Sequence, residues 1–153
     1  MSPVEVEQVE RANTAFYDAM ERGDLDLMAA IWLDGGVSCV HPGWPVLRGR
    51  ADVLRSYALI MANTEYIQFF LTDVEVSVEG DTALVTCTEN ILSGGPAEED
   101  GSAGPLVGGL VVATNVFRRT DSGWRLWAHH GSPVIAGADE EDDEGEPGGP
   151  TVG

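Results

Sequence analysis

The stretch VSCVHPGWPVLRGRADVLRSY, residues 37–57, decides the fold because it joins a short apolar strand to a helix through a bend that holds two prolines. Residues 37–41 are mainly apolar and β-branched, which favours a strand. In residues 50–61 the apolar side chains recur at helical spacing, which predicts a helix with Val53 on its inner face. His41 begins the bend, and it either fastens the bend by donating to a backbone carbonyl or takes part in chemistry.

Two further helices are predicted before this stretch. Pro3 favours a helix start, and apolar side chains then recur at steps of three and four until Arg22 and Gly23. Asp24 is a suitable cap for a second helix, which stops at the turn residues that follow Asp34. Three helices therefore lie in the first part of the chain.

The pattern changes period after the third helix. Four segments are rich in β-branched and aromatic residues: 65–79, 82–93, 106–119 and 124–130. Turn residues separate the first segment from the second and the third from the fourth. This order predicts an α+β protein in which the three N-terminal helices pack on one face of a strongly curved antiparallel or mixed sheet. Residues 1–135 suit one domain, and the polar, acidic residues 136–153 are predicted to form a disordered tail.

Charge and composition exclude several classes of partner. The formal net charge is −18 at pH 7, and all eight basic residues are arginines. Phosphate backbones and anionic lipid surfaces would repel such a chain, so neither nucleic acid nor a membrane is expected as a partner. Cys39 and Cys87 lie in apolar, strand-like runs and are expected to be buried free thiols. Together with an acidic N-terminus that lacks the pattern of a secretion signal, this composition predicts a cytoplasmic protein.

The adjacent histidines His129 and His130 do not predict a metal site. Neighbouring residues on a strand point to opposite faces, so the two imidazoles cannot share one ion. Neither a metal nor an organic cofactor is expected.

Three segments carry a family resemblance: FYDAMERGDLDLMAAIW, VSCVHPGWPVLRGRADVLRSY and ATNVFRRTDSGWRLWAHHGSP. Through them the chain resembles the SnoaL-like branch of the NTF2-like superfamily, relatives of ketosteroid isomerase, over residues 4–135. The resemblance implies a cone with a pocket at its wide end and a homodimer formed across the open face of the sheet. It identifies a fold better than an activity, because the superfamily contains both enzymes and assembly domains.

The resemblance also implies three catalytic candidates. His41 stands where the isomerases carry the aspartate that moves a proton at carbon, and an imidazole can do the same near neutral pH. Asn115 stands where they carry a carboxylic acid that donates to an oxyanion, although an internal hydrogen bond would serve its amide equally well. The resemblance places the Leu126 side of the last strand inward, and alternation then puts His130 in the pocket and His129 outside it.

The remaining pocket candidates are mainly apolar. They are Phe16, Trp32, Trp44, Tyr57, Val111, Ala113 and Leu126. The helix tyrosine of the isomerases corresponds to Ala15, and Tyr17, two positions further along the helix, is expected to point away from the pocket.

These residues leave three functions open. The first is a cofactor-independent isomerase, cyclase, dehydratase or hydrolase that acts on a small hydrophobic carbonyl compound, with His41 as general acid or base and Asn115 as oxyanion donor. The second is a domain that binds such a ligand without catalysis. The third is a homo-oligomeric assembly domain held together by its sheet face.

Overall fold

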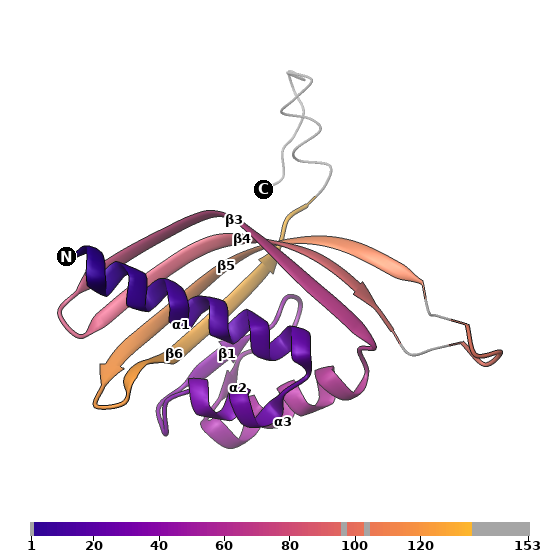
Figure 1. Cartoon of the computed structure of the whole chain (residues 1–153). Helices are drawn as coiled ribbons and strands as arrows, with labels where there is room; N and C mark the ends of the chain where they lie inside the picture. The colour runs from indigo at the N-terminus through magenta and orange to yellow at the C-terminus, as the bar shows by residue number, and fades with distance from the viewer. Residues whose placement is uncertain (1, 96–97, 103–104, 136–153) are drawn as a thin grey trace, which may run out of the picture.

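A computed structural model of the protein describes residues 2–95, 98–102 and 105–135 (Figure 1). The elements in these ranges are α1 (Pro3–Arg22), α2 (Leu25–Ile31), β1 (Ser38–Val40), β2 (Leu47–Arg48), α3 (Arg50–Ala62), β3 (Tyr66–Glu79), β4 (Thr82–Gly94), β5 (Leu106–Thr120) and β6 (Gly123–Pro133). The predicted order of helices and long strands is confirmed. The short strand β2 is an addition that the sequence did not predict.

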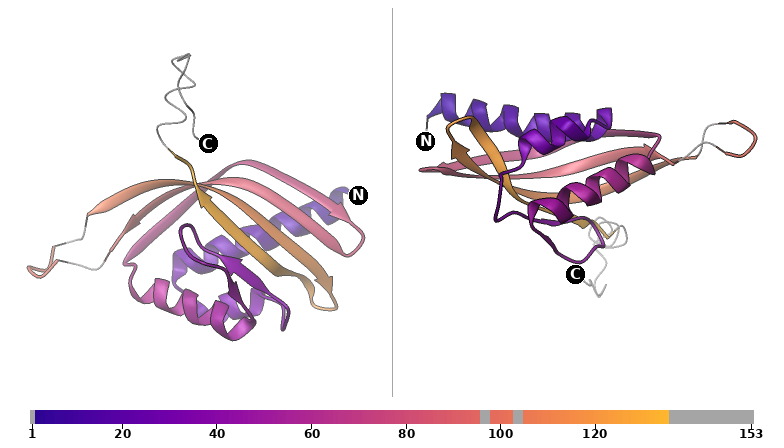
Figure 2. Two further views of the ribbon diagram at one scale, coloured as in Figure 1. Left: turned by 180° about the vertical axis from the view of Figure 1, so that it is seen from behind. Right: turned by 90° about the horizontal axis from the view of Figure 1, so that it is seen from below.

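All six strands of the described ranges belong to one mixed sheet, in the order β2-β1-β6-β5-β4-β3. β1 runs parallel to β6, and the other neighbouring strands are antiparallel. Figures 1 and 2 show the long strands β3 to β6 arching over the helices, with α1 lying along the concave side. The largest fully buried side chains include Phe16, Trp32, Tyr57 and Phe117, so the core lies between the helices and the sheet. The predicted α+β class is therefore confirmed.

Local signals at both ends explain where α1 begins and stops. Ser2 accepts a hydrogen bond from the backbone N–H of Glu5, and the Glu5 side chain accepts one from the backbone N–H of Ser2. This reciprocal cap, followed by Pro3 at the first helical position, satisfies donors that a helix start leaves free. At the other end Gly23 has a φ of 63°, a left-handed conformation that glycine adopts without strain.

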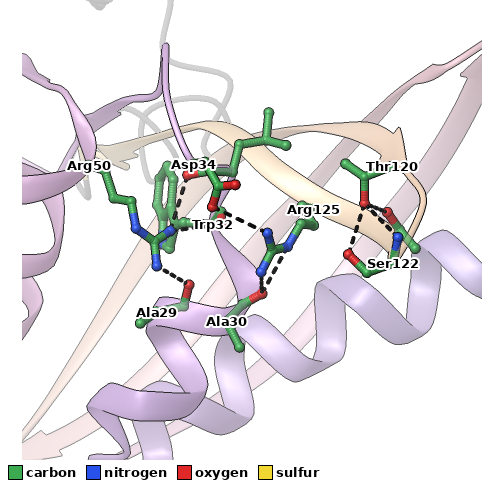
Figure 3. A network of polar contacts seen from close by, with 10 residues as sticks. Ala29, Ala30, Trp32, Asp34, Arg50, Thr120, Ser122 and Arg125 are labelled. Carbon is green, nitrogen blue, oxygen red and sulfur yellow. Dashed lines mark hydrogen bonds and ion pairs between the residues drawn. The ribbon is translucent and has the colours of Figure 1, made fainter.

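Two arginines hold the carboxyl end of α2 against the rest of the protein (Figure 3). The Arg50 guanidinium donates hydrogen bonds of 2.7–3.1 Å to three backbone carbonyls, those of Ala29, Trp32 and Leu33. Arg125 from β6 donates to the carbonyl of Ala30 at 2.8 Å. Cations at a helix C-terminus satisfy its free carbonyls and oppose its dipole. The contacts fix the start of α3, and α3 carries two of the polar side chains described below.

A bulge in β6 reverses the predicted orientation of the two histidines. The register with β5 shifts between the pairs that contain Leu126 and Ala128, so Trp127 is an extra residue in β6. As a result Leu126 and His129 are buried, whereas His130 is exposed. The prediction that His130 points inward and His129 outward is therefore wrong, because strict alternation fails at the bulge.

None of the helices in the described ranges combines the length and apolar character that a membrane crossing requires.

Candidate active site

A cavity of about 340 Å³ lies between the helices and the concave face of the sheet. Its wall is mainly aliphatic and aromatic, and α1, α3, the bend after β1 and strands β3 to β6 all contribute to it. The polar side chains on the wall are Tyr17, His41, Tyr57, Glu89, Ser93 and His129. Of the described residues, no arginine lines this cavity, so its wall offers no fixed positive charge.

The apolar candidates divide into two groups. Phe16, Trp44, Tyr57 and Val111 line the cavity. Trp32, Ala113 and Leu126 are fully buried in the core and do not line it. The predicted ligand contacts of these three are wrong, because their side chains fill the layer between the helices and the sheet. The Trp32 ring packs 6.4 Å from that of Phe16 and 6.1 Å from that of Tyr57, so it supports the wall from behind.

His41 is held by a hydrogen bond to α3. Its Nε2 atom lies 2.8 Å from the Ser56 hydroxyl oxygen, and that hydroxyl donates its single hydrogen to the carbonyl oxygen of Val53 at 2.6 Å. Ser56 must therefore accept from His41, which places the imidazole proton on Nε2 and leaves Nδ1 as the basic nitrogen. The rings of Trp44 and Tyr57 meet the His41 ring edge-on, with centroids 4.8 and 4.9 Å away.

The imidazole of His41 does not fasten the bend by donating to a backbone carbonyl, which was one of the two roles considered from the sequence. The bend is closed by the backbone, since the Trp44 N–H donates to the His41 carbonyl oxygen at 2.8 Å. The side chain instead reaches α3, and only 5% of the residue is exposed. Burial lowers the pKa of His41 to about 4, so the ring is neutral at physiological pH.

Asn115 lies at the centre of a buried polar network and does not line the cavity. Its Nδ2 atom donates to Asn13 Oδ1 at 2.8 Å and to Tyr17 Oη at 3.1 Å, and its Oδ1 atom lies 2.5 Å from His129 Nδ1. Both amide hydrogens are thus engaged within the protein. The prediction that Asn115 donates directly to a ligand oxygen is wrong, and the internal hydrogen bonds that the sequence left open are present.

His129 is the histidine of β6 that reaches the cavity. Because Asn115 Oδ1 can only accept, His129 donates from Nδ1 and keeps an unprotonated Nε2. Burial lowers the pKa of His129 to about 3, and the nearby His41 and His130 add to the decrease. The ring centroid of His129 lies 6.5 Å from that of His41, so two neutral imidazoles share one end of the cavity.

Glu89 is a buried cavity residue that the sequence reasoning missed. It lies on β4, is 4% exposed, and accepts a hydrogen bond of 2.6 Å from the Tyr17 hydroxyl at Oε2. Burial raises the pKa of Glu89 to about 7, although the hydrogen bond from Tyr17 opposes that rise. The signal was present, since alternation places Glu89 on the same side of β4 as the buried Val85 and Cys87.

Tyr17 also corrects the sequence interpretation. It was expected to point away from the pocket, yet it lines the cavity beside Phe16. The buried face of α1 is broader than a single stripe, because the helix lies in the concave side of the bent sheet. The buried residues of α1 include Val9, Asn13, Phe16 and Tyr17. Burial and the Glu89 carboxylate raise the pKa of Tyr17, so the phenol remains a donor.

In the described ranges, no group of three histidine, cysteine or acidic side chains is arranged to hold a metal ion.

Three helices on a bent mixed sheet, with a cavity between them, define an NTF2-like α+β protein. A family model described as the SnoaL-like domain matches residues 9–136. The chain therefore belongs to the SnoaL-like family, and the resemblance noted from the sequence is confirmed.

Comparison with known proteins gives three informative relatives. A Streptomyces avermitilis protein described as a "putative dehydratase from the NTF2-like family" is 69% identical, with a TM-score of 0.83 over 88% of this chain and 99% of that chain. A Thiobacillus denitrificans protein described as a "putative calcium/calmodulin-dependent protein kinase type II association domain" is 31% identical, with a TM-score of 0.67 over 82% and 94% of the two chains. The F-box protein SKIP8 of Arabidopsis thaliana is 26% identical over 125 residues, which are 80% of this chain and 48% of that protein. The chain thus spans about half the length of this plant relative.

Proposed function

We propose that this protein binds a small, uncharged and mainly apolar molecule in its cavity and moves a proton on that molecule with His41. The aromatic and aliphatic wall favours an apolar ligand, and the volume of about 340 Å³ lies within the range typical of small-molecule sites. The described wall carries no arginine to offset the charge of an anionic ligand. A buried carboxyl at Glu89 disfavours anions further.

The observation that carries this proposal is the state of His41. Its Nε2–H is fixed on Ser56, and the ring lines the cavity as a neutral base with Nδ1 unprotonated. A general base needs a defined tautomer and a position beside the reacting proton. The hydrogen bond to Ser56 supports this tautomer, and the place of His41 in the cavity wall supports contact with a bound ligand.

Dehydration is the reaction class that we favour. The 69% identical relative from Streptomyces avermitilis is described as a "putative dehydratase", and loss of water beside a carbonyl needs a base for the carbon-bound proton. The carbonyl oxygen needs a donor, and Tyr57 takes the role that the sequence assigned to Asn115. Tyr57 lines the cavity, burial raises its pKa, and the contact of its hydroxyl with the Cys39 thiol at 3.6 Å is weak.

The test uses His41→Gln beside His130→Gln, a matched control because His130 is exposed and does not line the cavity. Each protein is incubated with a panel of cyclic β-hydroxy ketones, and the conjugated enone product is followed by its absorbance. Binding of the uncharged fluorophore prodan and the melting temperature are measured in parallel. We expect His41→Gln to lower kcat about 10²–10⁴-fold while prodan binding and melting temperature change little.

Two outcomes would count against this proposal. Turnover that survives in His41→Gln would remove His41 from the reaction. Prodan binding without turnover of any panel member by the wild type would favour the second candidate, a ligand-binding domain without catalysis.

A further inference from the structure

Glu89 and His41 lie on elements that two other strands of the sheet separate. Glu89 therefore faces the proposed ligand from a different side of the cavity than His41. His41 follows β1 and Glu89 lies on β4, and β6 and β5 run between these strands. Both side chains line the same cavity. A molecule that fills the cavity would therefore lie between a neutral imidazole and a carboxyl group.

The hydrogen bonds around Glu89 determine which of its oxygens can carry a proton. The Asn115 amide donates to Tyr17 Oη, and the Tyr17 hydroxyl donates to Glu89 Oε2. Since Oε2 accepts this hydrogen, a proton on the carboxyl group belongs on Oε1. Among the described residues Oε1 has no hydrogen-bond partner, so it is available to a ligand.

We propose that Glu89 is a second catalytic residue, the acid that gives its Oε1 proton to the oxygen that leaves the substrate. This proposal rests on the proposed function, because it assigns the acid that complements His41 as the base. The substrate class is then a β-hydroxy carbonyl compound with an uncharged apolar body, placed with its carbonyl side near Tyr57 and its hydroxyl near Glu89.

The step balances without any further reagent. His41 Nδ1 takes a proton from the carbon next to the carbonyl, and the electron pair of the broken C–H bond forms the new C=C bond. The C–O bond on the next carbon breaks and leaves its electron pair on oxygen, which takes the Glu89 proton and departs as water. The products are an unsaturated carbonyl compound, an imidazolium at His41 and a carboxylate at Glu89.

The released water can return the proton from His41 to Glu89. Burial holds the pKa of His41 at about 4 and that of Glu89 at about 7, so the proton moves to Glu89 spontaneously. The resting site is then neutral, as a dry cavity requires. The titratable groups that share the cavity wall with Glu89 are Tyr17 from α1, His41 after β1, Tyr57 from α3 and His129 from β6, and Cys87 lies near it on β4. β3 and β5 present the apolar Leu71 and Val111 to it.

The test is the pH dependence of turnover in the full-length wild type, Glu89→Gln and the control His130→Gln. If Glu89 acts as the acid, wild-type kcat falls tenfold for each pH unit above about 7, the pKa of Glu89. Glu89→Gln lowers kcat about 10²–10⁴-fold and abolishes this dependence, with prodan binding retained. A profile that rises with pH near 7, or a Glu89→Gln enzyme with wild-type kcat, would overturn the acid role.

A second measurement does not depend on turnover. An ordinary carboxyl group is ionised at pH 6, so a protonated Glu89 should give an infrared C=O band that is absent from Glu89→Gln. Absence of this band from the wild type would also overturn the proposal. Loss of turnover in His41→Gln but not in Glu89→Gln would reject the acid role alone, whereas full turnover in both variants would reject the proposed function as well.

Discussion

The hydroxyl of Tyr17 lies 2.6 Å from Oε2 of Glu89, in a wall where the nearest strands contribute apolar side chains. This single hydrogen bond lowers the pKa of Glu89, but burial raises it more, to about 7. The carboxyl group therefore titrates near neutral pH inside the fold. It links the stability of the protein to the chemistry proposed for the cavity.

Replacement of Glu89 by Gln should stabilise the protein at high pH. Between pH 4.5 and about 7 the folded chain holds a proton that the unfolded chain releases, so this group makes the free energy of unfolding fall as pH rises. At about 1.4 kcal/mol per pKa unit the full effect is about 3 kcal/mol. Urea unfolding should show that the free energy of unfolding of Glu89→Gln, relative to that of the wild type, rises by about that much between pH 5 and pH 8. An equal difference at both pH values would mean that Glu89 is not protonated in the fold.

Replacement of Ser56 by Ala should impair turnover more than binding. The change removes the acceptor that fixes the Nε2–H tautomer of His41. The protein should lose about 0.5–1.5 kcal/mol of stability, the contribution of an ordinary hydrogen bond. Steady-state kinetics should show a lower kcat with a nearly unchanged KM, and Ser56→Thr should restore part of the activity. Unchanged kcat in Ser56→Ala would show that the tautomer does not depend on this contact.

Replacement of Gly131 by Ala should disturb the bend that carries His41. A Cβ atom at this position of β6 would lie 3.2 Å from Pro42 Cγ and 3.2 Å from Val111 Cγ1, closer than ordinary packing allows. We expect a loss of about 1–3 kcal/mol in stability and weaker prodan binding. Gly35→Ala is the control, since a Cβ there meets no atom within 4 Å. Equal effects of the two changes would show that Pro42 moves away from the added Cβ atom without a measurable loss of stability.

The outer face of the sheet is the surface on which we expect the homodimer to form. Leu84, Leu110 and Val112 are 42%, 38% and 49% exposed there, on the adjacent strands β4 and β5. Light scattering should give twice the mass of one chain, and Val112→Glu should give single chains. Val4→Glu on α1 is the control, because Val4 is 60% exposed away from the sheet. A wild type that is already monomeric would reject this expectation.

The helices and long strands could be predicted from the sequence because their signals are local. Pro3, the cap at Asp24 and the glycine after α1 act within a few residues and function as expected. α2 instead ends at Ile31, before the expected stop at Asp34, with Trp32 as its C-cap. The bulge at Trp127 has no such signal, because it depends on how β6 meets β5. Alternation counted through it assigned the wrong histidine to the cavity.

The site was predictable only in part, since burial is a property of the whole fold. His41 was found through its position before a proline and the family resemblance. Asn115 was found on the correct face of its strand, but its partners Asn13 and Tyr17 lie about a hundred residues away along the chain. Glu89 was overlooked although it is a charged residue on an otherwise apolar strand face, a pattern that indicates a functional or paired carboxyl group.

Nitrogen-15 NMR of the histidine side chains reports the charge and the tautomer of His41 in the folded protein. The chain has three histidines, so His41→Gln and His130→Gln suffice to assign the spectrum. We expect His41 to stay neutral, with its proton on Nε2, until the pH approaches 4, and we expect prodan to shift the signals of His41 and His129 but not that of His130. A His41 that takes up a proton near pH 6.5, or whose signal ignores the fluorophore, would contradict the proposed role of His41.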